Sequence, residues 1–130
     1  LVQKKIRVGV IGVGRGETFM KQAAVAGMEL VAVCDRWETP LKEMGKRFKV
    51  ATYTDYDRFL GHNMDAVVVA NYFHEHAPFA IKALNLAVIK LEDAGISMTD
   101  IIHAIDDLRD ELCEVERAFH LLPNTNGPLT

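Results

Sequence analysis

The sequence predicts an α/β fold in which helices cover both faces of a doubly wound parallel sheet of about five strands, followed by a long C-terminal amphipathic helix. Apolar, β-branched runs alternate with helical patterns of about ten residues, which is typical of parallel strands buried on both faces. A chain of 130 residues, 49% of them apolar, is long enough for one core and short for two. We therefore expect a single three-layer domain over residues 1–130.

Four apolar runs predict the first strands, because none of them shows the polar alternation of a half-exposed strand. They are Lys5–Ile11, Glu29–Asp35, the short Lys49–Thr54, and Asp65–Asn71. The helical patterns between and after them cover residues 17–26, a segment from Thr39 with Pro40 in its first turn, residues 55–60, and residues 75–86. This order predicts right-handed crossovers.

The last third of the chain differs in charge from the rest. Residues 1–87 hold 12 Lys and Arg against 9 Asp and Glu, whereas residues 88–130 hold 3 against 9. In the acidic part, Val88–Glu92 (VIKLE) is expected to form the fifth strand, and Ser97 is expected to begin a helix with Asp100 in its first turn. We expect a strand and a long acidic helix in residues 88–122 and an irregular tail in residues 123–130, which contain two prolines.

The helix expected from Ser97 to about His120 carries a regular apolar seam. Its members are separated alternately by four and three residues: Ile101, Ile105, Leu108, Leu112, Val115 and Phe119. This spacing is typical of a helix that packs one side against another surface. We expect the seam to cover one face of the sheet, and the alternative is a homodimer in which two such helices pair between chains.

Composition argues against several classes of partner. The formal net charge of -3 and the pI near 5.9 disfavour a nucleic-acid binder. No apolar run reaches the roughly 18 residues of a membrane helix, and the first residues run into a strand pattern without a leader. Cys34 and Cys113 lie far apart and show no metal-ligand spacing. We therefore expect no membrane, no metal site, two reduced thiols and a cytoplasmic location.

A glycine-rich turn, formed by Gly12, Gly14 and Gly16, separates the first predicted strand from the first helix. Backbone N–H groups and the positive end of a helix dipole can face a pyrophosphate there, where a Cβ would block the approach. Glu17 stands where the commoner G-x-G-x-x-G pattern has its third glycine. About twenty residues later Asp35 ends the second strand, where a carboxylate can accept hydrogen bonds from an adenosine ribose. The alternatives are glycines that serve only a turn and an Asp35 that caps a helix.

Three segments, IRVGVIGVGRGETFMKQAA, ELVAVCDR and DAVVVANYFHEHAPFAIKAL, resemble the nucleotide-binding half of the Gfo/Idh/MocA oxidoreductases over residues 4–84. The resemblance implies a Rossmann-like fold and a dinucleotide as ligand, with the pyrophosphate at Gly12, Gly14, Arg15 and Gly16. It places the ribose at Asp35, which favours NAD over NADP because a 2′-phosphate would meet a carboxylate. Arg36, the next residue, is either a solvated charge or a cover for the adenine.

In the same family a threonine-proline-x-histidine-x-histidine segment lies along the nicotinamide ribose. By position it corresponds here to Asn71, Tyr72, His74 and His76, of which Asn71 and Tyr72 depart from the commonest residues. The alternative for both histidines is a polar first turn of a helix.

The family's next element ends in glutamate-lysine-proline, and its lysine is associated with proton transfer. If Glu92 corresponds to the glutamate, Asp93 and Ala94 replace the lysine and proline, and Lys90 is displaced from the required position. We therefore expect no catalytic residue, and the 130 residues hold no segment for a substrate domain. Three hypotheses result: an NAD(H)-binding module that catalyses little, an engineered or chimeric scaffold without useful activity, and the cofactor half of an oxidoreductase acting on a sugar or polyol.

Overall fold

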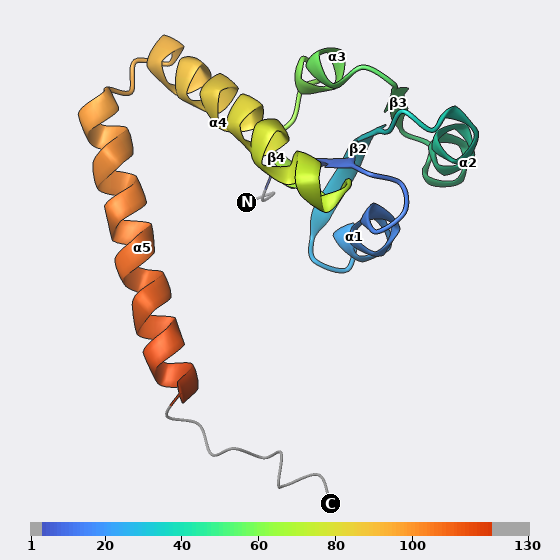
Figure 1. Ribbon diagram of the computed structural model, residues 1–130. Helices are drawn as coiled ribbons and strands as arrows, with labels where there is room; N and C mark the ends of the chain where they lie inside the picture. The colour runs from blue at the N-terminus through green and yellow to red at the C-terminus, as the bar shows by residue number, and fades with distance from the viewer. Residues whose placement is uncertain (1–3, 121–130) are drawn as a thin grey trace, which may run out of the picture. The chain divides into compact units, whose positions relative to one another are not determined.

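The computed structural model describes residues 4–120, with side chains to residue 118 (Figure 1). The chain divides into two units, one ending at Leu86 and the other beginning at Ala87. The first unit holds β1 (Ile6–Ile11), α1 (Gly16–Ala23), β2 (Met28–Cys34), α2 (Glu38–Phe48), β3 (Ala51–Tyr53), α3 (Tyr56–Leu60), β4 (Ala66–Val69) and the short 3-10 helix η1 (Phe73–Glu75). Helix α4 (His76–Asp93) begins in the first unit and ends in the second, which also contains α5 (Met98–His120).

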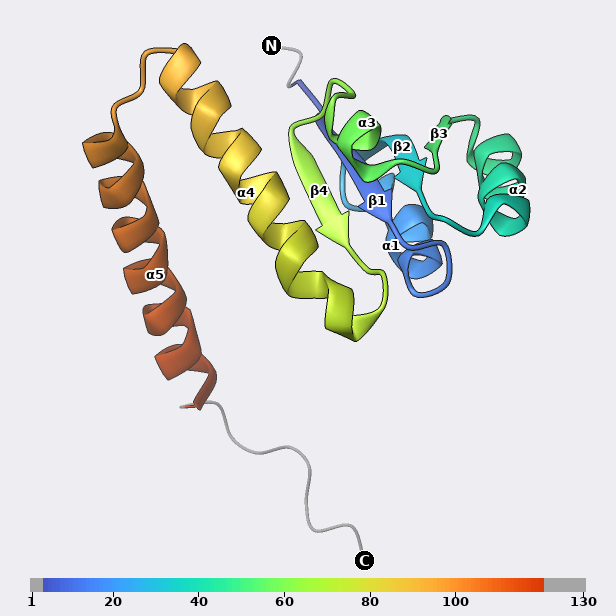
Figure 2. The same cartoon turned by 45° about the horizontal axis from the view of Figure 1, so that its top comes forward.

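The sheet of the first unit is parallel, with strand order β3-β2-β1-β4 (Figure 2). Neighbouring side chains of each central strand point to opposite faces, so Val10 and Val33 belong to one apolar cluster and Ile11 and Cys34 to another. Helices α1 and α2 contribute Met20 and Leu41 to the Val10 cluster. On the opposite face the cluster contains side chains of α3 and of the start of α4: Tyr56, Phe59, Leu60, Phe79, Ala83 and Leu86. The predicted α/β fold with helices on both faces of a parallel sheet is thereby confirmed.

The predicted fifth strand is wrong, because Val88–Glu92 lies inside α4. Apolar β-branched runs of this length fit either a strand or a buried helix, and no glycine or proline interrupts the chain between Pro78 and Gly95. Gly95 instead ends the helix with a φ of 84°. The N–H of Ile96 donates to the Leu91 carbonyl at 3.0 Å and that of Gly95 to the Glu92 carbonyl at 2.9 Å, the pattern of a Schellman motif.

Helix α5 begins at Met98, where Ser97 caps it as the sequence predicts. The Ser97 hydroxyl accepts the backbone N–H of Asp100 at 3.2 Å. Ile101 is buried, whereas the seam residues Ile105, Leu108, Leu112 and Val115 are 58 to 68% exposed. Burial of the whole seam against the sheet therefore stays a prediction. The side chain of Phe119 and the predicted irregular tail lie outside the described residues.

No helix among residues 4–120 is both long enough and apolar enough to cross a lipid bilayer.

Two of the three glycines after β1 are required, for different reasons. Gly12 has a φ of 100°, and a Cβ there would lie 2.5 Å from the Ala70 carbonyl oxygen. A Cβ on Gly16 would lie 2.7 Å from Cγ1 of the buried Val10, so this glycine lets α1 pack closely on β1. A Cβ on Gly14 would meet no atom within 4 Å. Gly14 is therefore the position of the turn where open space lies beside the backbone.

We predict that Gly16→Ala lowers the free energy of unfolding by about 1–3 kcal/mol, because Val10 is enclosed and cannot move away from the added methyl group. Gly14→Ala is the matched control and should change stability by less than about 0.5 kcal/mol. Urea denaturation followed by circular dichroism measures both values. Equal losses in the two variants would show that the turn, and not the contact between α1 and β1, sets the requirement for glycine.

Candidate functional site

A cavity of about 790 Å³ lies in the first unit beyond the carboxyl ends of β1, β2 and β4. In the sheet, β2 lies on one side of β1 and β4 lies on the other, so the direction of the strand order reverses at β1. Open α/β sheets bind ligands beyond the carboxyl ends of the strands at such a point. The lining comes from the ends of these strands and the loops after them: residues 11–15, 34–37, 54–57 and 70–75, with Pro78, Phe79 and Lys82 of α4.

The glycine turn forms one wall of the cavity. Gly12, Gly14 and Arg15 line it, and Arg15 directly precedes α1, whose first N–H groups are free of intrahelical partners. Arg15 is exposed and makes no ion pair within the part of the chain that the structure describes. Gly16 does not line the cavity, since it is buried against β1. The wall thus presents backbone amides, a helix N-terminus and one available guanidinium.

Asp35 connects the glycine turn to the end of β2. Its Oδ2 accepts the N–H of Val13 at 2.9 Å, and its Oδ1 accepts the N–H of Trp37, the N-cap residue of α2, at 2.8 Å. The second of these contacts fits the alternative of a capping aspartate, but the carboxylate also lines the cavity. Each carboxylate oxygen has a second lone pair, so Asp35 can accept further hydrogen bonds from a ligand.

Arg36 and Asn71, from loops after different strands, meet at Glu75. One Glu75 oxygen lies 3.2 Å from Nη2 of Arg36, and the other accepts from Nδ2 of Asn71 at 3.1 Å. Sequence reasoning missed Glu75, which stands at an unspecified position of the predicted segment, between His74 and His76. The Oδ1 atom of Asn71 is buried and has no hydrogen-bond partner among the described residues. An acceptor is therefore available at this edge of the cavity.

The other residues predicted after β4 divide into two groups. Tyr72 and His74 line the cavity, and their rings stack with centroids 6.0 Å apart. His76 does not line it; its Nε2 donates to the Asn71 carbonyl at 2.8 Å, because a carbonyl oxygen can only accept. His76 therefore holds the loop in place. The structure brings the predicted site residues together around one cavity, with Gly16 and His76 as the two exceptions.

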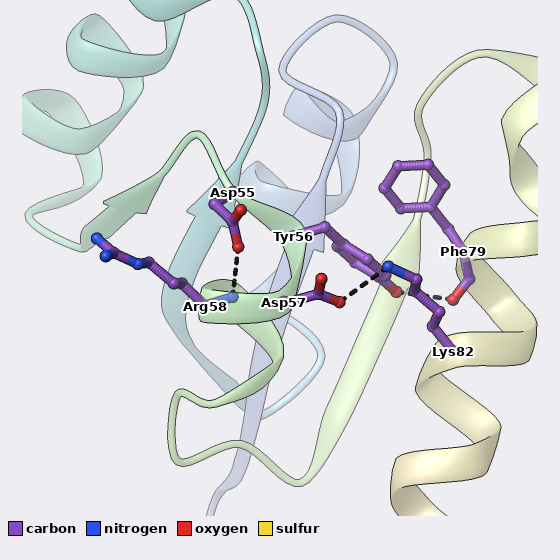
Figure 3. Close-up of polar contacts among 6 residues, drawn as sticks. All are labelled: Asp55, Tyr56, Asp57, Arg58, Phe79 and Lys82. Carbon is purple, nitrogen blue, oxygen red and sulfur yellow. Dashed lines mark hydrogen bonds and ion pairs between the residues drawn. The ribbon is translucent and has the colours of Figure 1, made fainter.

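The wall formed by α3 and α4 was not predicted from the sequence (Figure 3). Asp55 caps α3 by accepting the N–H of Arg58 at 2.8 Å, and the Tyr56 hydroxyl donates to the Phe79 carbonyl at 2.9 Å. Burial raises the pKa of Tyr56 to about 12, so the hydroxyl remains a donor at neutral pH. Asp57 and Lys82 form an ion pair at 2.9 Å. The only available signal was the polar run Thr54–Asp57 at the carboxyl end of a strand.

The cavity lining contains one thiol and charged groups of both signs. Burial raises the pKa of the Cys34 thiol to about 12, so it stays protonated at neutral pH and is a poor nucleophile. No cluster of three or more potential metal ligands occurs among the described residues. The charged lining residues are Arg15, Arg36, Lys82, Asp35, Asp55, Asp57 and Glu75, so carboxylates outnumber cations by one.

Comparisons with known proteins agree with this geometry. Residues 6–90 match the family described as "Oxidoreductase family, NAD-binding Rossmann fold" (GFO_IDH_MocA). The structure is similar to that of scyllo-inositol dehydrogenase from Lactobacillus casei with bound NAD(H) and scyllo-inositol, at 26% identity and a TM-score of 0.59 over 63% of this chain and 26% of that chain. Comparison with curated proteins finds no match.

Two further solved structures belong to the same group of dehydrogenases. The WlbA dehydrogenase from Bordetella pertussis in complex with NADH and UDP-GlcNAcA is 29% identical, with a TM-score of 0.57 over 61% of this chain and 26% of that one. Myo-inositol 2-dehydrogenase from Lactobacillus plantarum is 30% identical, with a TM-score of 0.52 over 62% and 26%. The chain therefore spans about a quarter of the length of these enzymes. Since the family match covers well over half of its residues, the chain belongs to the Gfo/Idh/MocA oxidoreductase family, within its NAD-binding Rossmann domain.

Proposed function

We propose that the cavity of the first unit binds NAD(H), with the pyrophosphate against Gly12, Gly14 and Arg15 and the adenosine ribose at Asp35. The observation that carries this proposal is the joining of the glycine turn to Asp35 by the hydrogen bond from Val13 at 2.9 Å, which presents backbone amides and a carboxylate to one cavity. Open space beside Gly14 suits the close approach of a pyrophosphate to the backbone. Structures of relatives with NAD(H) or NADH bound support the same ligand.

The nicotinamide half is proposed to lie along Asn71, Tyr72 and His74. These residues line the cavity on the β4 side, across the switch point from Asp35. The unpartnered Oδ1 of Asn71 fits a donor on the ligand, such as a ribose hydroxyl or a carboxamide. His76 contributes indirectly, by fixing the Asn71 carbonyl. When bound, the nicotinamide ring would accept a hydride, and these residues would position the ring.

We further propose that NAD is preferred to NADP. Arg36 and Lys82 are already paired with carboxylates, so Arg15 is the only lining cation without such a partner among the described residues. That arginine is the one we propose to serve the pyrophosphate. A 2′-phosphate would therefore approach Asp35 without an unpaired cation beside it.

The preference can be measured with Trp37, the only tryptophan of the chain and a residue of the cavity lining. NADH should quench its fluorescence saturably and at lower concentration than NADPH. Asp35→Asn should weaken this preference by about 1–2 kcal/mol, since the charge that repels the phosphate is removed. Asp65→Asn is a matched control: Asp65 also accepts a backbone N–H, from Arg7 at 2.9 Å, but lies outside the cavity lining.

Tighter binding of NADPH than of NADH would contradict the role given to Asp35. A folded chain that binds neither dinucleotide would favour the hypothesis of a scaffold without useful affinity.

We propose that this chain binds the dinucleotide without oxidising a substrate by itself. Val88–Glu92, the segment expected to carry the family's glutamate, lies in α4 and not in a strand, and Lys90 is not among the lining residues. For a complete enzyme, the inositol dehydrogenases among the relatives favour a polyol as the substrate class. The chain would then supply the cofactor half of the reaction.

Incubation of the chain with NAD and scyllo-inositol or myo-inositol should form no NADH above the rate of an enzyme-free blank. The reason is that Lys90, the lysine nearest to the family's position, lies outside the cavity lining, and the chain spans about a quarter of the length of the related inositol dehydrogenases. Absorbance of NADH is the measurement, and Lys90→Ala is the control. Turnover that disappears in Lys90→Ala would show that Lys90 performs the role of the family's lysine.

A homodimer through α5 remains a proposal as well. Ile105, Leu108, Leu112 and Val115 are more than half exposed, and their alternating spacing of three and four residues suits a second, identical helix. Sedimentation equilibrium should show a dimer that Leu108→Asp converts to a monomer, because a charge in the seam would be buried without a partner. A wild-type monomer at all concentrations would exclude this pairing.

A further inference from the structure

Glu75 joins the two loops that border the proposed dinucleotide site, those following β2 and β4. Its two carboxylate oxygens have different partners, the guanidinium of Arg36 at 3.2 Å and the amide of Asn71 at 3.1 Å. The Glu75 side chain is 19% exposed, whereas that of Arg36 is 78% exposed. The carboxylate is therefore the more enclosed and more firmly held partner of the pair.

Arg36 is the cation placed to receive an additional phosphate at the ribose. It follows Asp35 directly in the sequence and lines the same cavity. An arginine near this position is what allows a Rossmann site to accept a 2′-phosphate, since its fork of N–H donors matches phosphate oxygens. A guanidinium engaged by Glu75 is not available for that contact.

We propose that Glu75 is a specificity-determining residue that selects NAD over NADP by holding Arg36. This inference rests on the proposed binding of a dinucleotide in the cavity. Glu75 acts in two ways. It occupies the guanidinium, and it keeps a carboxylate beside the loop of Asp35 even when Arg36 turns away, because Asn71 still holds its second oxygen.

The ion pair affects the two dinucleotides differently. A 2′-phosphate would have to compete with Glu75 for the Arg36 guanidinium, whereas a ribose hydroxyl needs no cation. Exposed ion pairs contribute little to stability, so Glu75→Gln should leave the fold intact. Selection therefore depends on the competition between Glu75 and the phosphate for Arg36.

Glu75→Gln removes the charge and keeps an amide oxygen that can accept from Asn71. In the full chain, titrated with NADH and NADPH and followed by Trp37 fluorescence, this variant should bind NADPH about tenfold more tightly, the scale of one charge-assisted contact. The affinity for NADH should change by less than about threefold. Adding Arg36→Ala to Glu75→Gln should remove most of the gain, since the released guanidinium produces most of it.

Glu38→Gln is the matched control. Glu38 forms an exposed ion pair with Lys42 at 3.5 Å on α2, outside the cavity lining, so the ratio of NADPH to NADH affinity should keep its wild-type value. Circular dichroism and thermal melting verify that each variant is folded. Arg36→Ala in the wild-type background provides an independent test and should alter NADPH affinity by less than about threefold, because Glu75 already holds that guanidinium.

Two results would overturn the inference while leaving dinucleotide binding intact. One is NADH binding with an unchanged affinity ratio in Glu75→Gln. The other is a tenfold loss of NADPH affinity in Arg36→Ala alone, which would show that Arg36 already serves the phosphate. A folded wild-type chain that binds neither dinucleotide would instead overturn the proposed function, and the inference with it.

Discussion

The geometry of the first unit depends on the absence of a side chain at Gly12. The Gly12 N–H donates to the Cys34 carbonyl at 2.9 Å, and the Ala70 N–H donates to the Ile11 carbonyl at 2.9 Å, so the ends of β1, β2 and β4 are joined within two residues. A Cβ at Gly12 would lie 2.5 Å from the Ala70 carbonyl oxygen. Any larger residue would separate β1 from β4 where their order in the sheet reverses, and the cavity is built on that point.

Burial on both faces of the sheet makes this arrangement rigid. Val10, Val33 and Phe59 are among the most completely enclosed side chains, and they lie on different sides of the same central strands. Each apolar side chain of this size contributes about 1.5–3 kcal/mol when fully buried, before the cost of ordering it. The loops that carry polar residues therefore begin from fixed strand ends, as is usual for binding loops on α/β scaffolds.

The polar residues at the cavity are largely used in holding the loops to one another. Asp35 fixes the glycine turn, Glu75 connects Arg36 with Asn71, and His76 fixes the Asn71 carbonyl. A ligand then meets loops whose arrangement is already set, which lowers the entropy cost of binding. The same contacts also pair most of the positive charge, so discrimination between ligands of different charge comes from the few groups left unpaired.

The acidic second unit contains one feature that the local sequence pattern predicted correctly and one that it did not. The start of α5 at Ser97 followed from the local capping signal, whereas Val88–Glu92 was predicted as a strand and lies in α4. A short run of apolar, β-branched residues has the same appearance in both states. The first residue that ends the helix is Gly95, whose positive φ is a local property visible only once the backbone is placed.

The sequence by itself determined the four parallel strands, the helices between them, the glycine turn and Asp35, because each depends on short-range periodicity, turn chemistry or a fixed spacing along the chain. Only the tertiary structure decided that Gly16 packs on Val10 and that His76 supports the loop of Asn71. It also brought three residues to the cavity for which the sequence offered no role: Glu75, Tyr56 and Lys82. These residues contact partners in segments that follow different strands. The periodicity of one segment carries no information about which residue of another segment will lie beside it.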